Sequence, residues 1–426
     1  MQMKRLRLLG TALVATVCLA GSAVVSTPSE ASPDVASDPT VITEWNAIAA
    51  RTIFTENPTP APPSALYFGF VSIAMYDAVV TIEGGYEPYA AQPRAHANAS
   101  SEVAAATAAY RVLSHYFPAS AANLSADYSA SLAGIPDGVG MIHGKRVGEA
   151  AAAEIIRLRQ DDGRGATVPL NVAEGPGVWR PTPDAFAPMA FSWLGFVRPL
   201  LLDSPTQIPL PGPDPLTSDA YARDFEEVKA FGGNVGSSRT DAQTETALFW
   251  NANAVLQYQA AMRDQVTRRG LDIVESSRAF ALLNATTADS LISCWRAKYD
   301  FAYWRPITAI RMADTDGNEA TAPQADWTPL TQTPPYPEYT SGHACATGAM
   351  SNTVGHLFGP GAIDLNVSSS VTGTSRHYDT AAALDEETMN ARIWLGIHFR
   401  RAMTDANRLG HDVSSYGITH FFQPTG

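Results

Sequence analysis

Residues 65–82, ALYFGFVSIAMYDAVVTI, restrict the fold of this chain more than any other stretch, because they are apolar on almost every side. A helix with this pattern is buried on most of its faces, whereas a surface helix has one polar face. Gly84 and Gly85 follow the stretch and end it. The sequence therefore predicts a long helix that the rest of the fold must cover.

The composition of the chain favours helices around this stretch. Its 426 residues suffice for one large domain or two of moderate size, and 45% of them are apolar. Alanine is abundant and β-branched runs are few, and no stretch has a convincing strand pattern. The formal net charge of −13 argues against nucleic acid and against anionic membranes as partners. A cationic site in this chain would therefore have the opposite sign to its net charge.

Residues 1–31 predict a secretory signal peptide. Basic residues near the start precede the apolar run Leu8–Ala20, which has signal length and is too short to span a bilayer comfortably. Small residues around Ala31, or Ala20 itself, offer cleavage positions. The alternative is an uncleaved membrane anchor. We expect a soluble mature protein that is secreted, either extracellular or periplasmic, and has no membrane partner after cleavage.

Apolar periodicity and glycine or proline boundaries predict further helices along the chain. They are Val41–Phe54, Ala99–Tyr116, Ala119–Leu132, Gly138–Arg159, Asp219–Phe231, Asp241–Arg269, Leu271–Phe301, Ser341–Leu357, Asp385–Phe399 and Asp405–Phe422. Trp304–Pro337 and Gly359–Thr380 are expected as loops. The long proline- and glycine-rich stretch Ala166–Thr217 is interpreted as a seam and as a wall of a pocket. It would divide an N-terminal helical bundle, 32–200, from a C-terminal one, 201–426.

Three short pieces of the C-terminal half concentrate the groups that a tetrahedral oxyanion needs. They are KYDFAYWRP from Lys298, PPYPEYTSGH ending at His343, and RIWLGIH from Arg392 to His398. Together they hold three cations, a hydroxyl, a glycine amide and two imidazoles. Each piece alone has a plain structural explanation as a solvated face, a common tripeptide or a core histidine. Their combination favours an anion site.

The spacing within each piece bears on whether its side chains meet. Lys298 and Arg305 are seven residues apart, so on one helix both would leave the same face. The segment from Ser341 to His343 is typical of a helix start, whose free N–H groups suit an anion. The last Arg–His pair is six apart, about 120° from one face, and needs the reach of the arginine or a helix break to converge.

The ordered motifs KxxxxxxRP, SGH and RxxxxxH resemble the active-site signature of vanadium-dependent haloperoxidases and the related type 2 phosphatidic acid phosphatases (PAP2 superfamily). The gaps also agree, with 34 residues between Pro306 and Ser341 and 48 between His343 and Arg392. Softer likeness to bacterial members covers AMYDAV, VWRPTP and RTDAQTETALFW. The resemblance implies an all-α fold of two four-helix bundles, with the active site in the C-terminal bundle.

The resemblance implies an oxyanion-binding role for five of these residues. Lys298, Arg305 and Arg392 would bind the equatorial oxygens of vanadate, or of phosphate in the same site. Ser341 would hydrogen-bond the oxyanion through its hydroxyl and Gly342 through its amide. The physical chemistry agrees, because a buried oxyanion needs matched cations, and arginine pairs with two oxygens at once.

The two histidines would take the chemical roles. His343 matches the acid–base histidine, and His398 matches the one that bonds vanadium axially or attacks phosphorus. With vanadate, the implied reaction oxidises halide with hydrogen peroxide to hypohalous acid, with Lys298 polarising the peroxide, and a small organic substrate is halogenated. With phosphate monoesters, His398 would form a phosphohistidine and His343 would protonate the leaving alcohol.

The surroundings favour the haloperoxidase over the acid phosphatase. Trp295 and the run PPYP around Tyr336 resemble a tryptophan and a PPFP run of fungal vanadium chloroperoxidases. The resemblance therefore suggests that both aromatics line a halide or substrate pocket. The alternative is that they are core aromatics, which weighs most for Tyr336, since its hydroxyl could simply hydrogen-bond.

Two positions depart from the family pattern. Thr340 stands where proline usually precedes SGH, and threonine also caps helices well. Ala402 stands where many members place an aspartate four residues after the metal-binding histidine, which leaves the carboxylate that orients His398 open. Asp405 is the nearest, and another acid, from the loop or Asp412, is the alternative.

Cys294 and Cys345 flank the predicted site, while Cys18 lies in the signal peptide. A pair can bridge in an oxidising compartment. The interpretation favoured slightly over a bridge is two small buried thiols.

Overall fold

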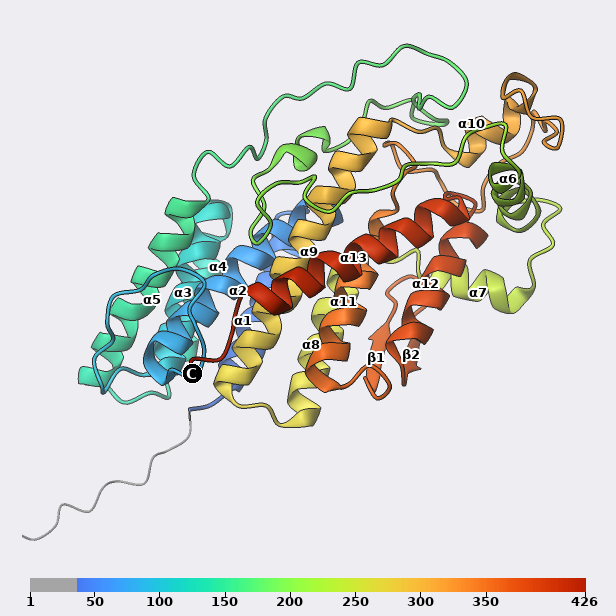
Figure 1. The fold of residues 1–426 in the computed structure, drawn as a ribbon. Helices are drawn as coiled ribbons and strands as arrows, with labels where there is room; N and C mark the ends of the chain where they lie inside the picture. The colour runs from blue at the N-terminus through green and yellow to red at the C-terminus, as the bar shows by residue number, and fades with distance from the viewer. Residues whose placement is uncertain (1–36) are drawn as a thin grey trace, which may run out of the picture. The chain divides into compact units, whose positions relative to one another are not determined.

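The structure, a computed structural model, describes residues 37–426, which fold into helices and one short hairpin (Figure 1). Its helices are α1 (Thr40–Ala50), α2 (Ala61–Glu83), α3 (Ser101–Tyr116), α4 (Ala121–Leu132), α5 (Val139–Leu158), α6 (Asp219–Gly232), α7 (Asp241–Phe249), α8 (Ala254–Arg269), α9 (Ile273–Phe301), α10 (Pro306–Arg311), α11 (Gly342–Phe358), α12 (Ala381–Trp394) and α13 (Arg400–His420). The predicted signal peptide lies outside the described residues. The division into bundles 32–200 and 201–426 stays a prediction.

Helices α2 and α9 form the centre of the fold. By length and apolarity α2 could cross a membrane, but 83% of its most apolar window is buried inside the protein, as expected of a core helix. It packs against α3, α5 and α9. The 29-residue α9 also packs against α11 and α13, so it contacts both the N-terminal and the C-terminal helices.

A buried polar network fixes α1, α2, α8 and α9 against one another. Gln259 on α8 accepts from Asn46 on α1 at 2.7 Å and donates to Asn284 on α9 at 2.6 Å. Asn284 in turn donates to Ser72 on α2 at 2.9 Å. Buried amides cost free energy unless every partner is in place, so this network specifies one packing register.

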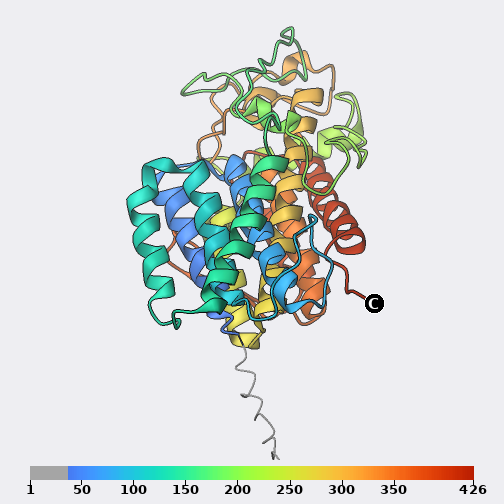
Figure 2. The same cartoon turned by 90° about the vertical axis from the view of Figure 1, so that its left-hand side faces the viewer.

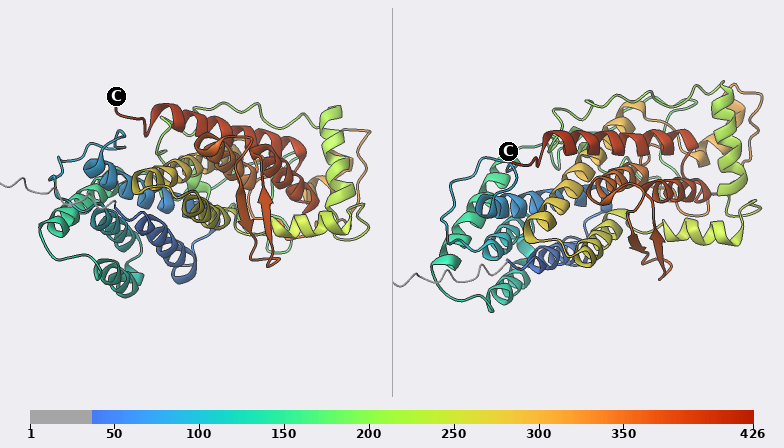
Figure 3. Two further views of the ribbon diagram at one scale, coloured as in Figure 1. Left: turned by 90° about the horizontal axis from the view of Figure 1, so that it is seen from below. Right: turned by 60° about the horizontal axis from the view of Figure 1, so that its bottom comes forward.

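Several expected elements differ in the structure. The loop predicted over Trp304–Pro337 contains the short helix α10, and the helix predicted over Asp385–Phe399 ends at Trp394. The helix predicted over Asp241–Arg269 is broken into α7 and α8, because Asn253 accepts a hydrogen bond from the Leu256 amide and starts a new helix. The loop predicted over Gly359–Thr380 contains an antiparallel hairpin of β1 (Leu365–Ser368) and β2 (Ser375–Tyr378). This hairpin lies beside α8 and α12 (Figure 3). Its four-residue strands are too short to give a clear alternating pattern.

The stretch expected as a seam, Ala166–Thr217, is largely irregular and gathers with the loops after α10 at one end of the helices (Figure 2). The buried Asp289 on α9 holds it by accepting three consecutive backbone N–H groups, Leu200 to Leu202, at 2.6–2.8 Å. Ala190 of this stretch donates its amide to the Pro335 carbonyl at 2.8 Å. The irregular stretch therefore lies directly over the loop that precedes α11.

Helices α11 and α13 approach so closely that glycine is required between them. A Cβ on Gly348 would lie 2.2 Å from the Asn407 carbonyl oxygen, and one on Gly410 would lie 2.3 Å from the Cys345 carbonyl oxygen. Both obstacles are backbone atoms, which cannot rotate away. This contact positions the start of α11.

We predict that Gly348→Ala lowers the free energy of unfolding by about 1–3 kcal/mol, the usual cost of overpacking, as measured by urea denaturation. The matched control is Gly361→Ala, because a Cβ there would meet no atom within 4 Å. If Gly348→Ala were as stable as the control, the close approach of α11 and α13 would be wrong.

Candidate active site

The three pieces singled out in the sequence meet at one end of α9 and α11. Lys298 lies in the last turn of α9, Arg305 immediately precedes α10, and Ser341 immediately precedes α11. Arg392 lies in the last turn of α12, and His398 lies between α12 and α13. All five residues are buried.

Lys298 and Arg305 do not share a helix, and the predicted end of the first helix at Phe301 is confirmed. Helix α9 ends at Phe301, where Ala302 takes a left-handed conformation with φ of 42°. Pro306 then starts α10, since its fixed φ suits the first position of a helix. The two cations converge across this turn and do not share a helix face.

The Lys298 ammonium is held by the loop before α11. It donates to the carbonyl oxygens of Pro337 at 2.9 Å and Glu338 at 3.2 Å, and to that of Thr340. An ammonium has three N–H groups, so all of them are bonded to this loop. Burial, together with the positive charge of Arg305, lowers the pKa of Lys298 to about 8.

In each arginine of the site, some N–H groups donate a hydrogen bond and at least one nitrogen has no partner in the described residues. Arg305 donates to the Tyr336 carbonyl at 2.8 Å and the Ile397 carbonyl at 2.7 Å, while its Nη2 is buried without a partner among the described residues. Arg392 donates through Nη1 to the Trp250 carbonyl at 2.8 Å, and its Nε is likewise buried without a partner in residues 37–426. Unpaired buried donors are rare and point to a missing acceptor.

The three cations form a buried cluster of positive charge. Lys298 and Arg305 are 0% exposed and Arg392 is 4% exposed, yet within residues 37–426 none of them lies within 4 Å of a carboxylate. Burial lowers the pKa of Arg392 to about 10, and Arg305 adds to the effect. Isolated buried charge is expensive, so the cluster fits a multiply charged oxyanion such as vanadate or phosphate.

A helix break brings His398 to the cations. Helix α12 ends at Trp394, and Gly396 has a φ of 78° that turns the chain. His398 Nε2 then lies 3.4 Å from Arg305 Nη1. Of the two routes considered for Arg392 and His398 to converge, the structure contains the helix break.

Glu338 orients His398 and is the site residue that the sequence reasoning did not name. Its Oε1 lies 2.8 Å from His398 Nδ1 and accepts from the Phe399 amide at 3.0 Å. Because Oε1 already serves as an acceptor for the amide, we assign the proton to His398 Nδ1, which leaves the Nε2 lone pair facing Arg305. Burial raises the pKa of Glu338 to about 8.

The acids considered from the sequence have other roles. Asp405 accepts from the Tyr339 hydroxyl at 2.8 Å and pairs with Arg401 at 2.7 Å, and Asp412 is exposed. Of the alternatives left open, the acid is the one from the loop. The signal that could have found Glu338 is a lone carboxylate between a proline-rich run and SGH.

The start of α11 supplies the predicted hydroxyl and amide. The buried Ser341 caps the helix, its Oγ lying 3.5 Å from the Ala344 amide nitrogen. A Cβ on Gly342 would lie 3.0 Å from Trp295 Cζ3, so Trp295 requires glycine there. The first amides of a helix have no intrahelical acceptor, which leaves them available to an anion.

His343 is half-buried and faces the cations from α11. Its Nε2 donates to the Ala252 carbonyl at 3.1 Å, which leaves Nδ1 as the free nitrogen. Burial, with the nearby charge of Arg392, lowers the pKa of His343 to about 3. Burial and the charges of Arg305, Lys298 and Arg392 lower the pKa of His398 well below its ordinary value. Both imidazoles are therefore neutral near pH 7 in the anion-free protein.

A cavity of about 70 Å³ opens beside the cations. Trp295, Tyr336, Gly342 and His343 line one side of it, and apolar residues of α2 and α8 line the other. The rings of Trp295 and Tyr336 lie 5.0 Å apart, and Lys298 Nζ lies 4.9 Å from the Tyr336 ring centre. The two aromatics predicted for a substrate pocket thus border a cavity at the site.

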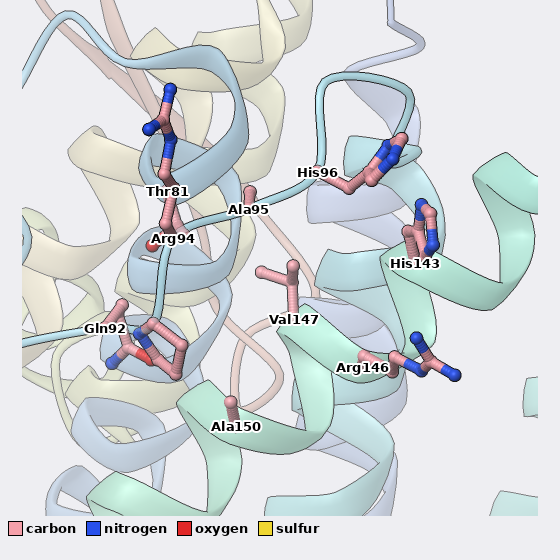
Figure 4. A pocket seen from close by; sticks show the side chains of 10 residues that line it. Thr81, Gln92, Arg94, Ala95, His96, His143, Arg146, Val147 and Ala150 are labelled. Carbon is pink, nitrogen blue, oxygen red and sulfur yellow. The ribbon is translucent and has the colours of Figure 1, made fainter.

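A larger cavity of about 370 Å³ lies in the N-terminal half and holds none of the predicted site residues (Figure 4). The rings of His96 and His143 lie there in a tilted contact, with ring centres 3.9 Å apart. The side chains of Arg94 and Arg146 point away from each other, so no cation cluster forms in this cavity.

Known proteins resemble this chain in part of its sequence and in its fold. Residues 278–424 match the family model described as the VCPO second helical-bundle domain. A curated relative, vanadium chloroperoxidase of Curvularia inaequalis, is 23% identical over a 223-residue alignment, and the match covers 38% of this chain and 37% of that protein. The match thus spans little more than a third of that relative's length.

Two solved structures share the fold. One, described as the first bacterial vanadium-dependent iodoperoxidase, has a TM-score of 0.75 and 22% identity, covering 91% of this chain and 96% of that one. The other, a holo-type bacterial vanadium-dependent chloroperoxidase, has a TM-score of 0.69 and 17% identity, covering 90% and 97%.

We predict that His398 carries its proton on Nδ1 in the wild type, as read from the ring ¹⁵N chemical shifts of labelled protein. Glu338→Ala removes the acceptor, so a mixture of tautomers is expected, with a loss of about 1–3 kcal/mol in the free energy of unfolding. Asp405→Asn is the matched control and should keep the Nδ1–H form. A wild-type spectrum of the Nε2–H tautomer would contradict the assigned role of Glu338.

We predict that His343 makes stability depend on pH in a defined direction. Its pKa is depressed in the folded state, so its contribution is present above the unfolded pKa of about 6.5 and is lost as pH falls. Between pH 7.5 and 5.5, the wild type should lose up to about 1.4 kcal/mol more than His343→Asn. Urea denaturation at both pH values measures this difference, with exposed His420→Asn as the control. Equal losses in wild type and His343→Asn would refute it.

Proposed function

We propose, because the chain belongs to the vanadium haloperoxidase superfamily, that it is a vanadate-dependent haloperoxidase that uses hydrogen peroxide to oxidise halide to hypohalous acid. The observation that carries the proposal is the buried cluster of Lys298, Arg305 and Arg392, which has no carboxylate within 4 Å in residues 37–426. Such a cluster calls for an anion of matching charge.

The residues that would hold vanadate have donors directed to no protein acceptor. Arg305 Nη2 and Arg392 Nε are buried and unpaired in the described part of the chain. The Ser341 hydroxyl and the Gly342 amide would add hydrogen bonds at the start of α11. Vanadate, when bound, supplies the Lewis-acidic centre that activates peroxide toward halide.

The chain's own residues prepare this chemistry. Glu338 holds the His398 ring so that a neutral Nε2 faces the cations, as a metal ligand or a nucleophile requires. His343 presents a free Nδ1 from the opposite helix and would hold or move a proton there. Lys298 would contact the oxyanion after it exchanges one of its three carbonyl bonds.

The cavity beside the cations supports a halogenation reaction. Trp295 and Tyr336 would form the pocket for the halide or for a small organic substrate. Hydrogen peroxide, halide and that substrate are the proposed partners. We further propose that residues 1–31 direct secretion, so that the reaction takes place outside the cytoplasm.

A PAP2-type acid phosphatase is the second candidate, because the same features suit it. A neutral imidazole with a bare Nε2 beside two guanidinium groups is also the arrangement that a phosphohistidine mechanism needs. Phosphate would then occupy the cation cluster as part of a substrate ester.

We predict that the mature chain from residue 32, freed of bound anion, halogenates a phenol dye with peroxide and bromide or chloride only after orthovanadate is added. Phosphate should suppress the reaction by competing for the cations. His398→Ala should reduce the rate by at least about two orders of magnitude, because it removes the imidazole nitrogen that would bind vanadate. His377→Ala, on the exposed hairpin, is the control.

The same preparation is tested on p-nitrophenyl phosphate without vanadate. Turnover of this ester that vanadate inhibits, with no halogenation, would overturn the haloperoxidase in favour of the phosphatase. Retained halogenation by His398→Ala would overturn the role of that residue.

A further inference from the structure

Two thiols that the proposed reaction does not use lie against the cation cluster. Cys294 and Cys345 are both free and 0% exposed. Cys294 lies one helical turn before Lys298 on α9, so the two side chains leave the same face. Cys345 lies in the first turn of α11, two residues after His343. The favoured expectation of unpaired buried thiols agrees with this structure.

One residue, Thr340, touches both thiols. Its hydroxyl lies 3.3 Å from Cys294 Sγ and 3.7 Å from Cys345 Sγ. Ser290, one turn earlier on α9, donates to the Cys345 carbonyl at 3.0 Å, which fixes the two helices side by side. The two sulfur atoms therefore approach the same hydroxyl from neighbouring helices.

Cys294 and Lys298 share one hydrogen-bond acceptor. The Cys294 thiol donates to the Thr340 carbonyl at 3.4 Å, and Lys298 Nζ donates to the same oxygen. A peroxide molecule that reaches Lys298 thus arrives beside Cys294. The cavity beside the cations is lined by Trp295, which follows Cys294 in the chain, and by Ala346, which follows Cys345.

The local charge favours reaction at Cys294 first. Burial acts to raise the pKa of the Cys294 thiol, but the Cys345 hydrogen bond and the charge of Lys298 outweigh it and lower the pKa to about 7. Burial raises the pKa of Cys345 well above its usual value. A thiolate is the nucleophile in thiol oxidation, so one thiol is prepared to attack and the other to resolve.

From this geometry we propose that Cys294 and Cys345 are a redox-active pair that hydrogen peroxide converts into a disulfide, which loosens the oxyanion site through Thr340. The proposal rests on the proposed function for its oxidant, since peroxide is the substrate of the neighbouring site.

The reaction balances in two steps. The Cys294 thiolate attacks one peroxide oxygen, so an S–O bond forms, the O–O bond breaks, and hydroxide leaves. Cys345 then attacks the sulfur of the sulfenic acid, so the S–S bond forms and the S–O bond breaks, and the second hydroxide takes the thiol proton. Two thiols and one peroxide give one disulfide and two waters, with two electrons passing from sulfur to oxygen.

Oxidation would act on the anion site through hydrogen bonds. A disulfide has no S–H, so the Thr340 carbonyl loses one of its two donors. Once the two sulfur atoms are bonded to each other, they cannot both keep their present contacts with the Thr340 hydroxyl. We therefore expect Thr340 to shift. Thr340 immediately precedes Ser341, which caps α11 and would bind the oxyanion. The oxidised form is therefore expected to bind anions more weakly.

The full chain is treated with hydrogen peroxide, and in parallel with diamide, and then alkylated and analysed by peptide mass spectrometry. A peptide pair that joins Cys294 to Cys345 and is lost after reduction is expected, and mapping distinguishes it from any bond to Cys18. Inorganic phosphate binding, measured by calorimetry, should weaken by about tenfold after oxidation and recover with reductant.

Cys294→Ser and Cys345→Ser are the matched variants. Both should fail to form the bond, and phosphate binding by Cys294→Ser should not respond to diamide. Thiols that stay free under oxidant but alkylate after denaturation would overturn the pair, and a bond that leaves phosphate affinity unchanged would overturn the coupling. The diamide and phosphate measurements need no halogenation, so they remain decisive if the proposed function fails.

Discussion

The site depends on one electrostatic constraint, which is positive charge buried without carboxylate partners. Lys298, Arg305 and Arg392 are almost completely inaccessible, and the folded chain offers them mainly backbone carbonyl oxygens. Dipoles of this kind compensate a full charge only in part. The protein must therefore stabilise the cluster with the rest of its fold, and an anion that enters it gains the uncompensated attraction. This holds whether the physiological anion is vanadate or phosphate.

The loop between α10 and α11 fixes the positions of the side chains around this charge. Its carbonyl groups bind Lys298, and its Glu338 carboxylate fixes the His398 ring. It also leads into Ser341 at the start of α11. The irregular stretch over residues 166–217 lies against the same loop through the bond from Ala190. A single loop thus contacts Lys298, Arg305 and the His398 imidazole, and it leads into the start of α11.

Much of this arrangement could be predicted from the sequence, because strong local signals carry it. The apolar run of α2 and the capping serine of α11 follow from periodicity and helix boundaries. The helix expected over Asp385–Phe399 ends instead at Trp394, and the turn at Gly396 was not predicted. The family resemblance added the order of the site residues. The break between α7 and α8 at Asn253 was missed, because the apolar pattern continues across it. The end of α9 at Phe301 was predicted, but the six-residue helix α10 was missed inside the loop expected over Trp304–Pro337.

Tertiary contacts that join distant residues were also beyond prediction. Glu338 and His398 are 60 residues apart, and only the folded chain shows that the loop acid reaches the ring. The three carbonyl bonds of Lys298 are of the same kind, as no sequence pattern marks a backbone acceptor. They hold Lys298 on the loop before α11, so an anion that binds Lys298 would have to replace one of these bonds.

The central claim is that the buried cations form one oxyanion site, and the most direct test is equilibrium binding of orthovanadate to phosphate-free protein by calorimetry. The account predicts saturable binding of one vanadate per chain, competition by phosphate, and an affinity at least about tenfold weaker in Arg392→Leu. Absent binding, or an affinity that Arg392→Leu leaves unchanged, would contradict it.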